Sequence, residues 1–94
     1  MWKVAGDSSV NKHESSLRVK SAFESLLHEI PGLQELEVGI DISHVDYAFN
    51  VVLYSVFENA DALAAYATHP AHLKVRDELV GLRVERCQVD YEAP

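Results

Sequence analysis

Residues 47–57 read Tyr47-Ala48-Phe49-Asn50-Val51-Val52-Leu53-Tyr54-Ser55-Val56-Phe57. Almost every position in this stretch is apolar, which is typical of a β-strand that is covered on both faces of its sheet. One layer of helices covers one face only. We therefore predict that a second layer lies over the other face, and this requirement decides the architecture.

The residues before this strand predict a helix between two further strands. Residues 1–5 form the end of a strand, and residues 36–42 alternate apolar and polar side chains as a half-buried strand does. Between them, apolar residues recur at helical spacing on one face, namely Val19, Ala22, Phe23, Leu26, Leu27 and Ile30. Pro31-Gly32 is expected to end that helix.

The residues after the strand predict two helices and a last strand. Asn59 is a good cap for one helix, and Pro70 suits the first turn of another, which Gly81 ends. Residues 84–91 then alternate, with Cys87, Val89 and Tyr91 on one side. The order strand, helix, strand, strand, helix, strand predicts an α+β fold with a ferredoxin-like, split β-α-β sheet.

A ferredoxin-like sheet carries its helices on one side and leaves the opposite face bare. The doubly apolar strand requires that face to be covered, and two sheets packed face to face would cover it. A chain of 94 residues, 48% of them hydrophobic, also has only a small core as a single domain over residues 1–94. We therefore predict a homodimer that pairs as a dimeric α+β barrel.

The composition excludes several classes of partner. The 15 acidic and 8 basic residues give a net charge of −7, which argues against nucleic acid and membrane surfaces, because both attract basic proteins. No secretory signal and no apolar run of about 18 residues occurs. The lone Cys87 fits a reducing, cytoplasmic setting, and its place in an alternating strand predicts a small core residue.

Residues 64–72 hold the candidate chemistry. They read Ala64-Ala65-Tyr66-Ala67-Thr68-His69-Pro70-Ala71-His72, and the proline-marked break between two helices aims Tyr66 and His72 at a common region. Both side chains can take part in proton transfer. Alternatively, His72 is a hydrogen-bonded residue at the helix–sheet junction, and Tyr66 is a core aromatic whose hydroxyl has one partner. His69 is predicted to cap the second helix.

A cavity between sheet and helices is a second candidate site. Its lining would be Trp2, Phe23, Leu53 and Phe57. Core packing explains these side chains as well, so both interpretations stay open. No metal is expected, because His69 and His72 have no further ligand nearby in sequence and a metal needs three or four. No cofactor is expected either, since no glycine-rich nucleotide loop occurs.

Several short motifs stand in order along the chain. They are Ile30-Pro31-Gly32-Leu33, Leu36-Glu37-Val38-Gly39, Val56-Phe57-Glu58, Leu63-Ala64-Ala65-Tyr66, His69-Pro70-Ala71-His72 and Val89-Asp90-Tyr91-Glu92. This ordered set resembles the stress-responsive A/B barrel, or Dabb, family. The resemblance implies a homodimer in which two four-stranded sheets form a central barrel with the helices outside. Family members usually begin with a longer first strand that carries a histidine, and this sequence opens roughly six residues later.

Two functional hypotheses follow. The first is a stress-responsive homodimer without assigned activity that holds a small apolar or aromatic ligand. Its ligand-binding residues would be Trp2, Phe23, Leu53, Tyr66, His69 and His72. The second comes from the resemblance to plant polyketide cyclases of the family, in which residues matching His72 and Tyr66 act as base and assisting group in a cofactor-independent, aldol-type ring closure. A purely structural oligomer without a pocket is the third hypothesis.

Overall fold

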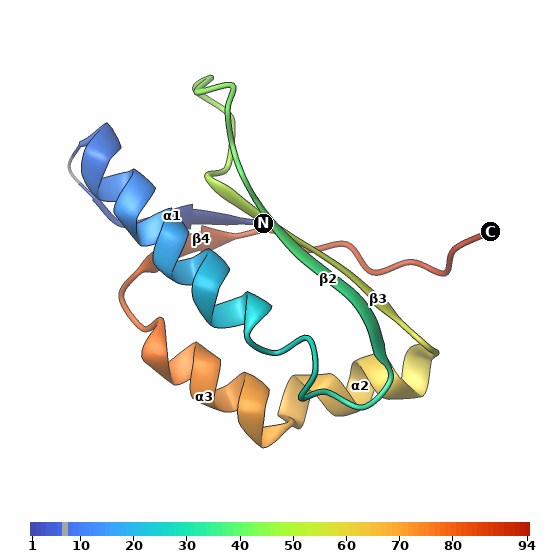
Figure 1. Ribbon diagram of the computed structural model, residues 1–94. Helices are drawn as coiled ribbons and strands as arrows, with labels where there is room; N and C mark the ends of the chain where they lie inside the picture. Colours follow the sequence, from blue (N-terminus) through green and yellow to red (C-terminus); the bar gives the residue numbers. More distant parts are fainter. Residues whose placement is uncertain (7) are drawn as a thin grey trace.

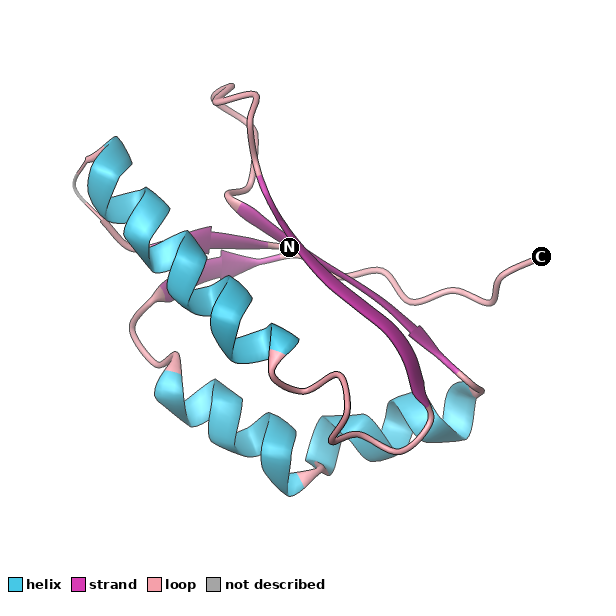
Figure 2. Cartoon of the chain, viewed as in Figure 1, coloured by secondary structure: helices cyan, strands magenta, loops and turns pink. Residues whose placement is uncertain are grey.

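The computed structural model of the chain describes residues 1–6 and 8–94. Its elements, in chain order, are β1 (Trp2–Val4), α1 (Ser9–Glu24), β2 (Leu33–Ile40), β3 (Val51–Phe57), α2 (Ala60–Thr68), α3 (Pro70–Glu78) and β4 (Arg83–Arg86). The four strands form one antiparallel sheet in the order β2-β3-β1-β4. The helices lie on one side of this sheet (Figure 1; Figure 2), so the predicted α+β, ferredoxin-like architecture is confirmed.

The core lies between the sheet and helices α1 and α3. Its buried apolar residues are Val4, Val19, Phe23, Leu26, Ile30, Val38, Val51, Val75 and Leu79. Burying such side chains is the main favourable term in folding, at about 25 cal/mol for each Å² of apolar surface. The predicted apolar stripe is therefore confirmed for Val19, Ala22, Phe23, Leu26 and Ile30, whereas Leu27 lies outside the core.

Helix α1 ends at Glu24, so the predicted end at Pro31-Gly32 was wrong. The backbone N–H of Leu26 donates to Phe23 O and that of Glu29 donates to Leu26 O, both at 3.0 Å. Residues 25–30 therefore form tight turns in place of α-helix. These turns still direct Leu26 and Ile30 into the core, which is why the apolar spacing continues past the helix.

Strand β3 begins at Val51, so the prediction of a strand from Tyr47 was wrong. Residues 41–50 form a loop, in which the Asp41 carboxylate accepts the backbone N–H of His44 at 2.9 Å. Side chain–backbone bonds of this kind favour turns over strand pairing. The loop leaves Tyr47 84% exposed and Ile42, which had been expected to alternate within β2, 91% exposed.

Strand β4 ends at Arg86, so the prediction of a strand to Tyr91 was wrong. A pair of hydrogen bonds between Met1 and Cys87 closes the ladder, at 2.7 and 2.9 Å. The pairing of β4 with β1 ends at Arg86, opposite Trp2, and residues 88–94 extend away from the body as a tail (Figure 1). Cys87 is consequently an exposed free thiol and not the predicted core residue.

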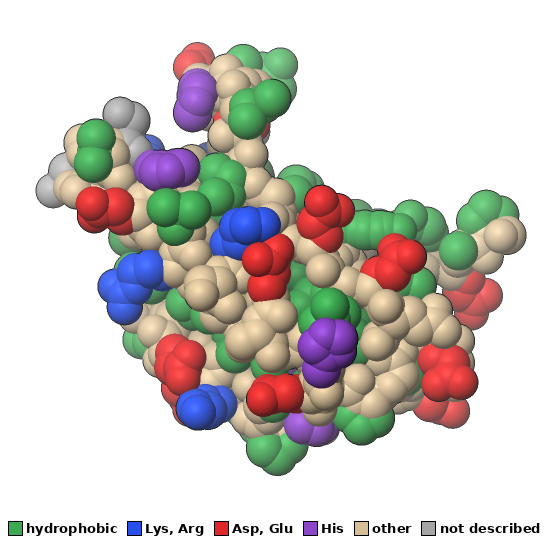
Figure 3. Space-filling model, viewed as in Figure 1, with side chains coloured by type: hydrophobic (Ala, Val, Ile, Leu, Met, Phe, Trp, Pro, Cys, Tyr) green, Lys and Arg blue, Asp and Glu red, His purple; other side chains and the backbone are tan. Residues whose placement is uncertain are grey.

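The sheet face opposite the helices, here called the open face, carries both apolar and charged side chains. Val52 and Tyr54 of β3 are 44% and 46% exposed, and the ion pair between Lys3 and Glu85 joins β1 to β4 at 3.2 Å. The loop at 41–50 and the tail project beyond the body and carry further apolar side chains (Figure 3). Among residues 1–6 and 8–94, no helix has the length and apolar character needed to cross a bilayer.

Candidate functional site

A break between α2 and α3 positions the candidate residues. Pro70 has no backbone N–H, and its ring cannot follow a preceding helical turn, so α2 stops and α3 starts in a new direction. Two histidine side chains then satisfy the backbone groups at the break. His69 Nδ1 accepts the Ala71 N–H at 3.1 Å, and His72 Nδ1 lies 3.2 Å from Ala67 O. The predicted capping role of His69 is thereby confirmed.

The contact with Ala67 fixes the protonation of His72. A carbonyl oxygen only accepts, so Nδ1 of His72 carries the proton and Nε2 is the basic nitrogen. Partial burial lowers the pKa of His72, and the positive charges of Arg76 and Arg83 lower it further. The hydrogen bond to Ala67 O acts in the opposite direction and raises the pKa. The imidazole is therefore neutral at pH 7, and its basic Nε2 has no hydrogen-bond partner among residues 1–6 and 8–94.

Tyr66 lies directly against His72. The two ring centroids are 4.2 Å apart at an interplanar angle of 34°, so no room remains between the rings. The Tyr66 hydroxyl is buried and finds no hydrogen-bond partner within the part of the chain that the structure describes. Burial raises the pKa of Tyr66 to about 12, although Arg83 opposes the shift, and the hydroxyl therefore stays protonated as a donor at neutral pH.

Five rings form a continuous line from β1 to β3, here called the aromatic row. In order they are Trp2, Phe23, His72, Tyr66 and Phe57. Successive centroids are 5.0, 6.4, 4.2 and 5.1 Å apart. Three of these separations lie in the range of about 4.5–7 Å that is usual for interacting aromatic pairs, and Tyr66 and His72 are closer still.

The row contains most of the side chains predicted for the site. Trp2, Phe23, Tyr66 and His72 come together in it, and Phe57 completes it at the β3 end. Leu53 is partly buried against the core, whereas His69 serves the helix cap. The sequence prediction of a common region for Tyr66 and His72 thus describes the geometry correctly.

Arg83 is the site residue that sequence reasoning missed. Its guanidinium carbon lies 5.1 Å from the centroid of the Trp2 ring and 5.5 Å from that of Phe23, within the range of cation–π attraction. The pairing of Val4 with Arg83 places both side chains on the helix-facing side of the sheet. That pairing, which no local pattern reveals, was the signal needed to find it.

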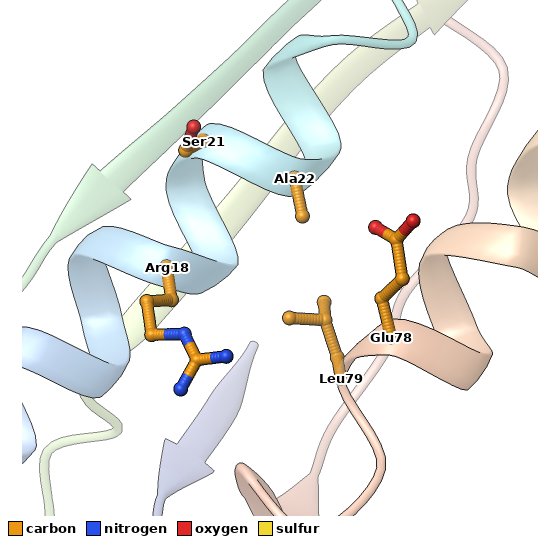
Figure 4. A pocket seen from close by; sticks show the side chains of 5 residues that line it. All are labelled: Arg18, Ser21, Ala22, Glu78 and Leu79. Carbon is orange, nitrogen blue, oxygen red and sulfur yellow. The ribbon is translucent and has the colours of Figure 1, made fainter.

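Two surface cavities lie outside the aromatic row. One of about 270 Å³ opens between α1 and α3 (Figure 4); it is lined by Arg18, Ser21 and Ala22 of α1, by Glu78 of α3 and by Leu79. The other, of about 480 Å³, lies beside the 41–50 loop and includes Met1, Phe49 and Val52 in its lining. Neither is lined by the residues predicted to bind a ligand.

Comparison with known proteins identifies the family of this α+β chain. The model of the stress responsive A/B barrel domain, Dabb, matches residues 1–93. The chain belongs to this family. No functionally curated protein matches the sequence.

Two solved structures resemble this Dabb domain. A dimeric protein of unknown function with a ferredoxin-like fold from Bacteroides fragilis is 33% identical, with a TM-score of 0.83 over 98% of this chain and 89% of that one. A dimeric ferredoxin-like protein of unknown function from Jannaschia sp. is 23% identical, with a TM-score of 0.64 over 88% of this chain and 81% of that one. The second likeness concerns the fold alone.

Proposed function

We propose that this Dabb domain is a cytoplasmic homodimer that holds a small apolar or aromatic ligand at the aromatic row. The observation that carries the ligand proposal is the buried Tyr66 hydroxyl, which has no hydrogen-bond partner among the described residues. Leaving such a group unsatisfied costs about 1–3 kcal/mol. A ligand with an oxygen or nitrogen acceptor would recover that free energy, and the neighbouring rings would pack on its apolar part.

The homodimer is supported by the open face and by the dimeric protein from Bacteroides fragilis, which is 33% identical to this chain. Val52, Tyr54 and the neighbouring 480 Å³ cavity leave apolar surface on the face that no helix covers. A second copy packed on the open face would bury this apolar surface and would contact the projecting 41–50 loop and the 88–94 tail. The free thiol of Cys87 suits a reducing compartment, which supports the cytoplasmic assignment.

The ligand proposal is tested by titrating the protein with 1-naphthamide, a neutral aromatic compound that has a hydrogen-bond acceptor. Trp2 is the single tryptophan, so its indole N–H gives one signal in an amide NMR spectrum and reports binding at the row. We expect this signal to shift on saturation and Tyr66→Phe to weaken the affinity about fivefold, because one hydrogen bond is lost. Tyr54→Phe, on the open face, is the matched control. Absence of binding by calorimetry would contradict the proposal.

A cofactor-independent enzyme is the second candidate, and the state of His72 favours it. The neutral ring has its proton fixed on Nδ1 and a basic Nε2, as a base for a proton next to a carbonyl requires. Tyr66 would donate to the oxygen on which negative charge develops, as in an aldol-type cyclisation. The ring contact between the two residues requires a substrate to approach from outside the pair and not from between them.

The enzyme hypothesis is tested by deuterium exchange at the α-carbon of benzylacetone in D₂O. We expect the wild-type protein to accelerate loss of the α-proton NMR signal and His72→Asn to abolish the acceleration. Asparagine keeps a donor for Ala67 O but is not a base. Exchange at the buffer rate with the wild-type protein would remove this hypothesis without touching the ligand proposal.

A further inference from the structure

Arg83 is a partly buried cation that forms no ion pair with the described residues. The ion pairs found in that part of the chain are Lys3–Glu85, which joins β1 to β4, and Lys20–Glu24 on α1. Stacking on Trp2 and Phe23 attracts the guanidinium through its charge but uses none of its five N–H donors. Arginine donors taken out of water are ordinarily paired, so this arrangement leaves binding capacity at the site.

The charges around Arg83 also favour the binding of a ligand at this site. Desolvation lowers the pKa of Arg83, and the nearby positive charges of Arg76 and Arg86 lower it further. The protein as a whole carries a net charge of −7, yet Arg76 and Arg86 both lie near enough to act on the charge of Arg83. Like charges gathered next to a low-dielectric aromatic row create a positive potential, which is complementary to an anion.

We propose that the ligand held at the aromatic row carries a carboxylate, which the Arg83 guanidinium binds while the buried Tyr66 hydroxyl donates to the same ligand. This inference rests on the proposed ligand-binding function. The guanidinium fork matches the two oxygens of a carboxylate, and a charge-assisted pair of this kind is about twice as strong as a neutral hydrogen bond. The rings of Trp2 and Phe23 hold the guanidinium in place and would pack on the apolar part of the ligand, so the inferred ligand class is an aromatic or apolar carboxylic acid.

The role of Arg83 is tested by comparing 1-naphthoate with 1-naphthamide by calorimetry at pH 7 and low salt. These probes differ in charge but have almost the same shape. We expect the wild-type protein to bind the carboxylate at least tenfold more tightly. Arg83→Gln should bring the two affinities together, and Arg83→Lys should keep part of the preference. Arg18→Gln, the same chemical change in the cavity between α1 and α3, should leave the preference intact.

Each outcome separates the inference from the function on which it rests. Equal wild-type affinities for both probes would overturn the carboxylate inference and leave the ligand proposal standing. A preference that Arg83→Gln does not change would overturn the assignment to Arg83. Binding of neither probe would contradict the inference and the proposed function together. The wild-type comparison needs no variant, so the inference stays falsifiable even if Arg83→Gln does not fold.

Discussion

Two histidine side chains take the place of one helical hydrogen bond at the break between α2 and α3. In an uninterrupted helix the Ala71 N–H would donate to Ala67 O. Here His69 accepts from that N–H and His72 donates to that carbonyl. The same break that a proline enforces therefore fixes the tautomer of His72 and holds its ring against Tyr66. The contacts that give His72 a structural role at the helix break are therefore the same contacts that leave its Nε2 basic.

The pH dependence of stability follows from His72. Its pKa is lower in the folded protein than in the unfolded chain, so the unfolded state binds the proton first as the pH falls. The contribution of this residue to stability is complete above the unfolded pKa of about 6.5 and is lost as the pH falls through the folded pKa. We expect His72→Asn to weaken the decline in the free energy of unfolding between pH 7 and pH 5, measured by urea denaturation. An unchanged slope would contradict the lowered pKa.

Because the Tyr66 hydroxyl has no partner among the described residues, its removal is not expected to destabilise the protein. Removing a buried polar group that has a partner is destabilising, whereas removing one without a partner relieves a desolvation cost. We therefore expect Tyr66→Phe to leave the free energy of unfolding unchanged or to raise it by up to about 1 kcal/mol. Urea denaturation of the ligand-free protein measures this. A loss above about 1 kcal/mol would mean that the hydroxyl has a partner in solution.

The residues of the site were predictable where local spacing or an apolar pattern marks them, as it does for Trp2 and Phe23. Tyr66, His69 and His72 stand within one helix break, so their spacing and Pro70 suffice to bring them together. Arg83 depends on the pairing of β4 with β1, at the other end of the chain. Its neighbours in sequence are those of any charged residue in a short strand, and no local pattern distinguishes it.

The ends of the elements were harder to predict than their order. The apolar pattern of residues 19–30 is satisfied equally by helix and by tight turns, because both direct Leu26 and Ile30 inward. The alternation after Arg86 resembles a strand, but the pairing of β4 with β1 ends at Arg86, opposite Trp2. Hydrogen-bond partners decide where a strand stops, and those partners are distant in sequence.

The turn between α1 and β2 docks closely on helix α2, and Gly32 makes this possible. Its φ of +79° favours glycine, and an added Cβ would lie 2.6 Å from the Cβ of Ala62. Gly81 has a similar φ of +86° but nothing within 4 Å of an added Cβ. We expect Gly81→Ala to lower the free energy of unfolding by about 1 kcal/mol, because only backbone strain is added. Gly32→Ala should lower it by roughly 2 kcal/mol more, because the new Cβ also collides with Ala62. Equal losses in urea denaturation would show that the turn and α2 are not packed this closely.

At the scale of the whole molecule, one chain leaves a sheet half covered. The helices occupy one side, and the other retains Val52, Tyr54 and the cavity beside the loop. The apolar strand predicted over residues 47–57 is longer than β3, which begins at Val51. The observed alternation along β3, 2% exposed at Val51 against 44% at Val52, shows which side chains remain for a partner.

A charge placed on the open face tests the homodimer. Val52→Glu adds a carboxylate to a face that already carries Glu35 and Glu37 of β2, opposite Val56 and Tyr54. Because Val52 is 44% exposed within one chain, the substitution leaves the fold intact while a face-to-face dimer would bury the new charge without a partner. We expect light scattering to give twice the 10.5 kDa chain mass for the wild-type protein and the chain mass itself for the variant.

Leu73→Glu is the matched control for that substitution. Leu73 lies on α3 and is 39% exposed, so it offers a comparable apolar side chain on the helical side, away from the open face. This variant should remain dimeric and should unfold at a temperature that still rises with protein concentration, as linkage between folding and association requires. Loss of the dimer in both variants, or in neither, would place the interface elsewhere. Loss in Val52→Glu alone assigns the open face as the surface that the two copies share.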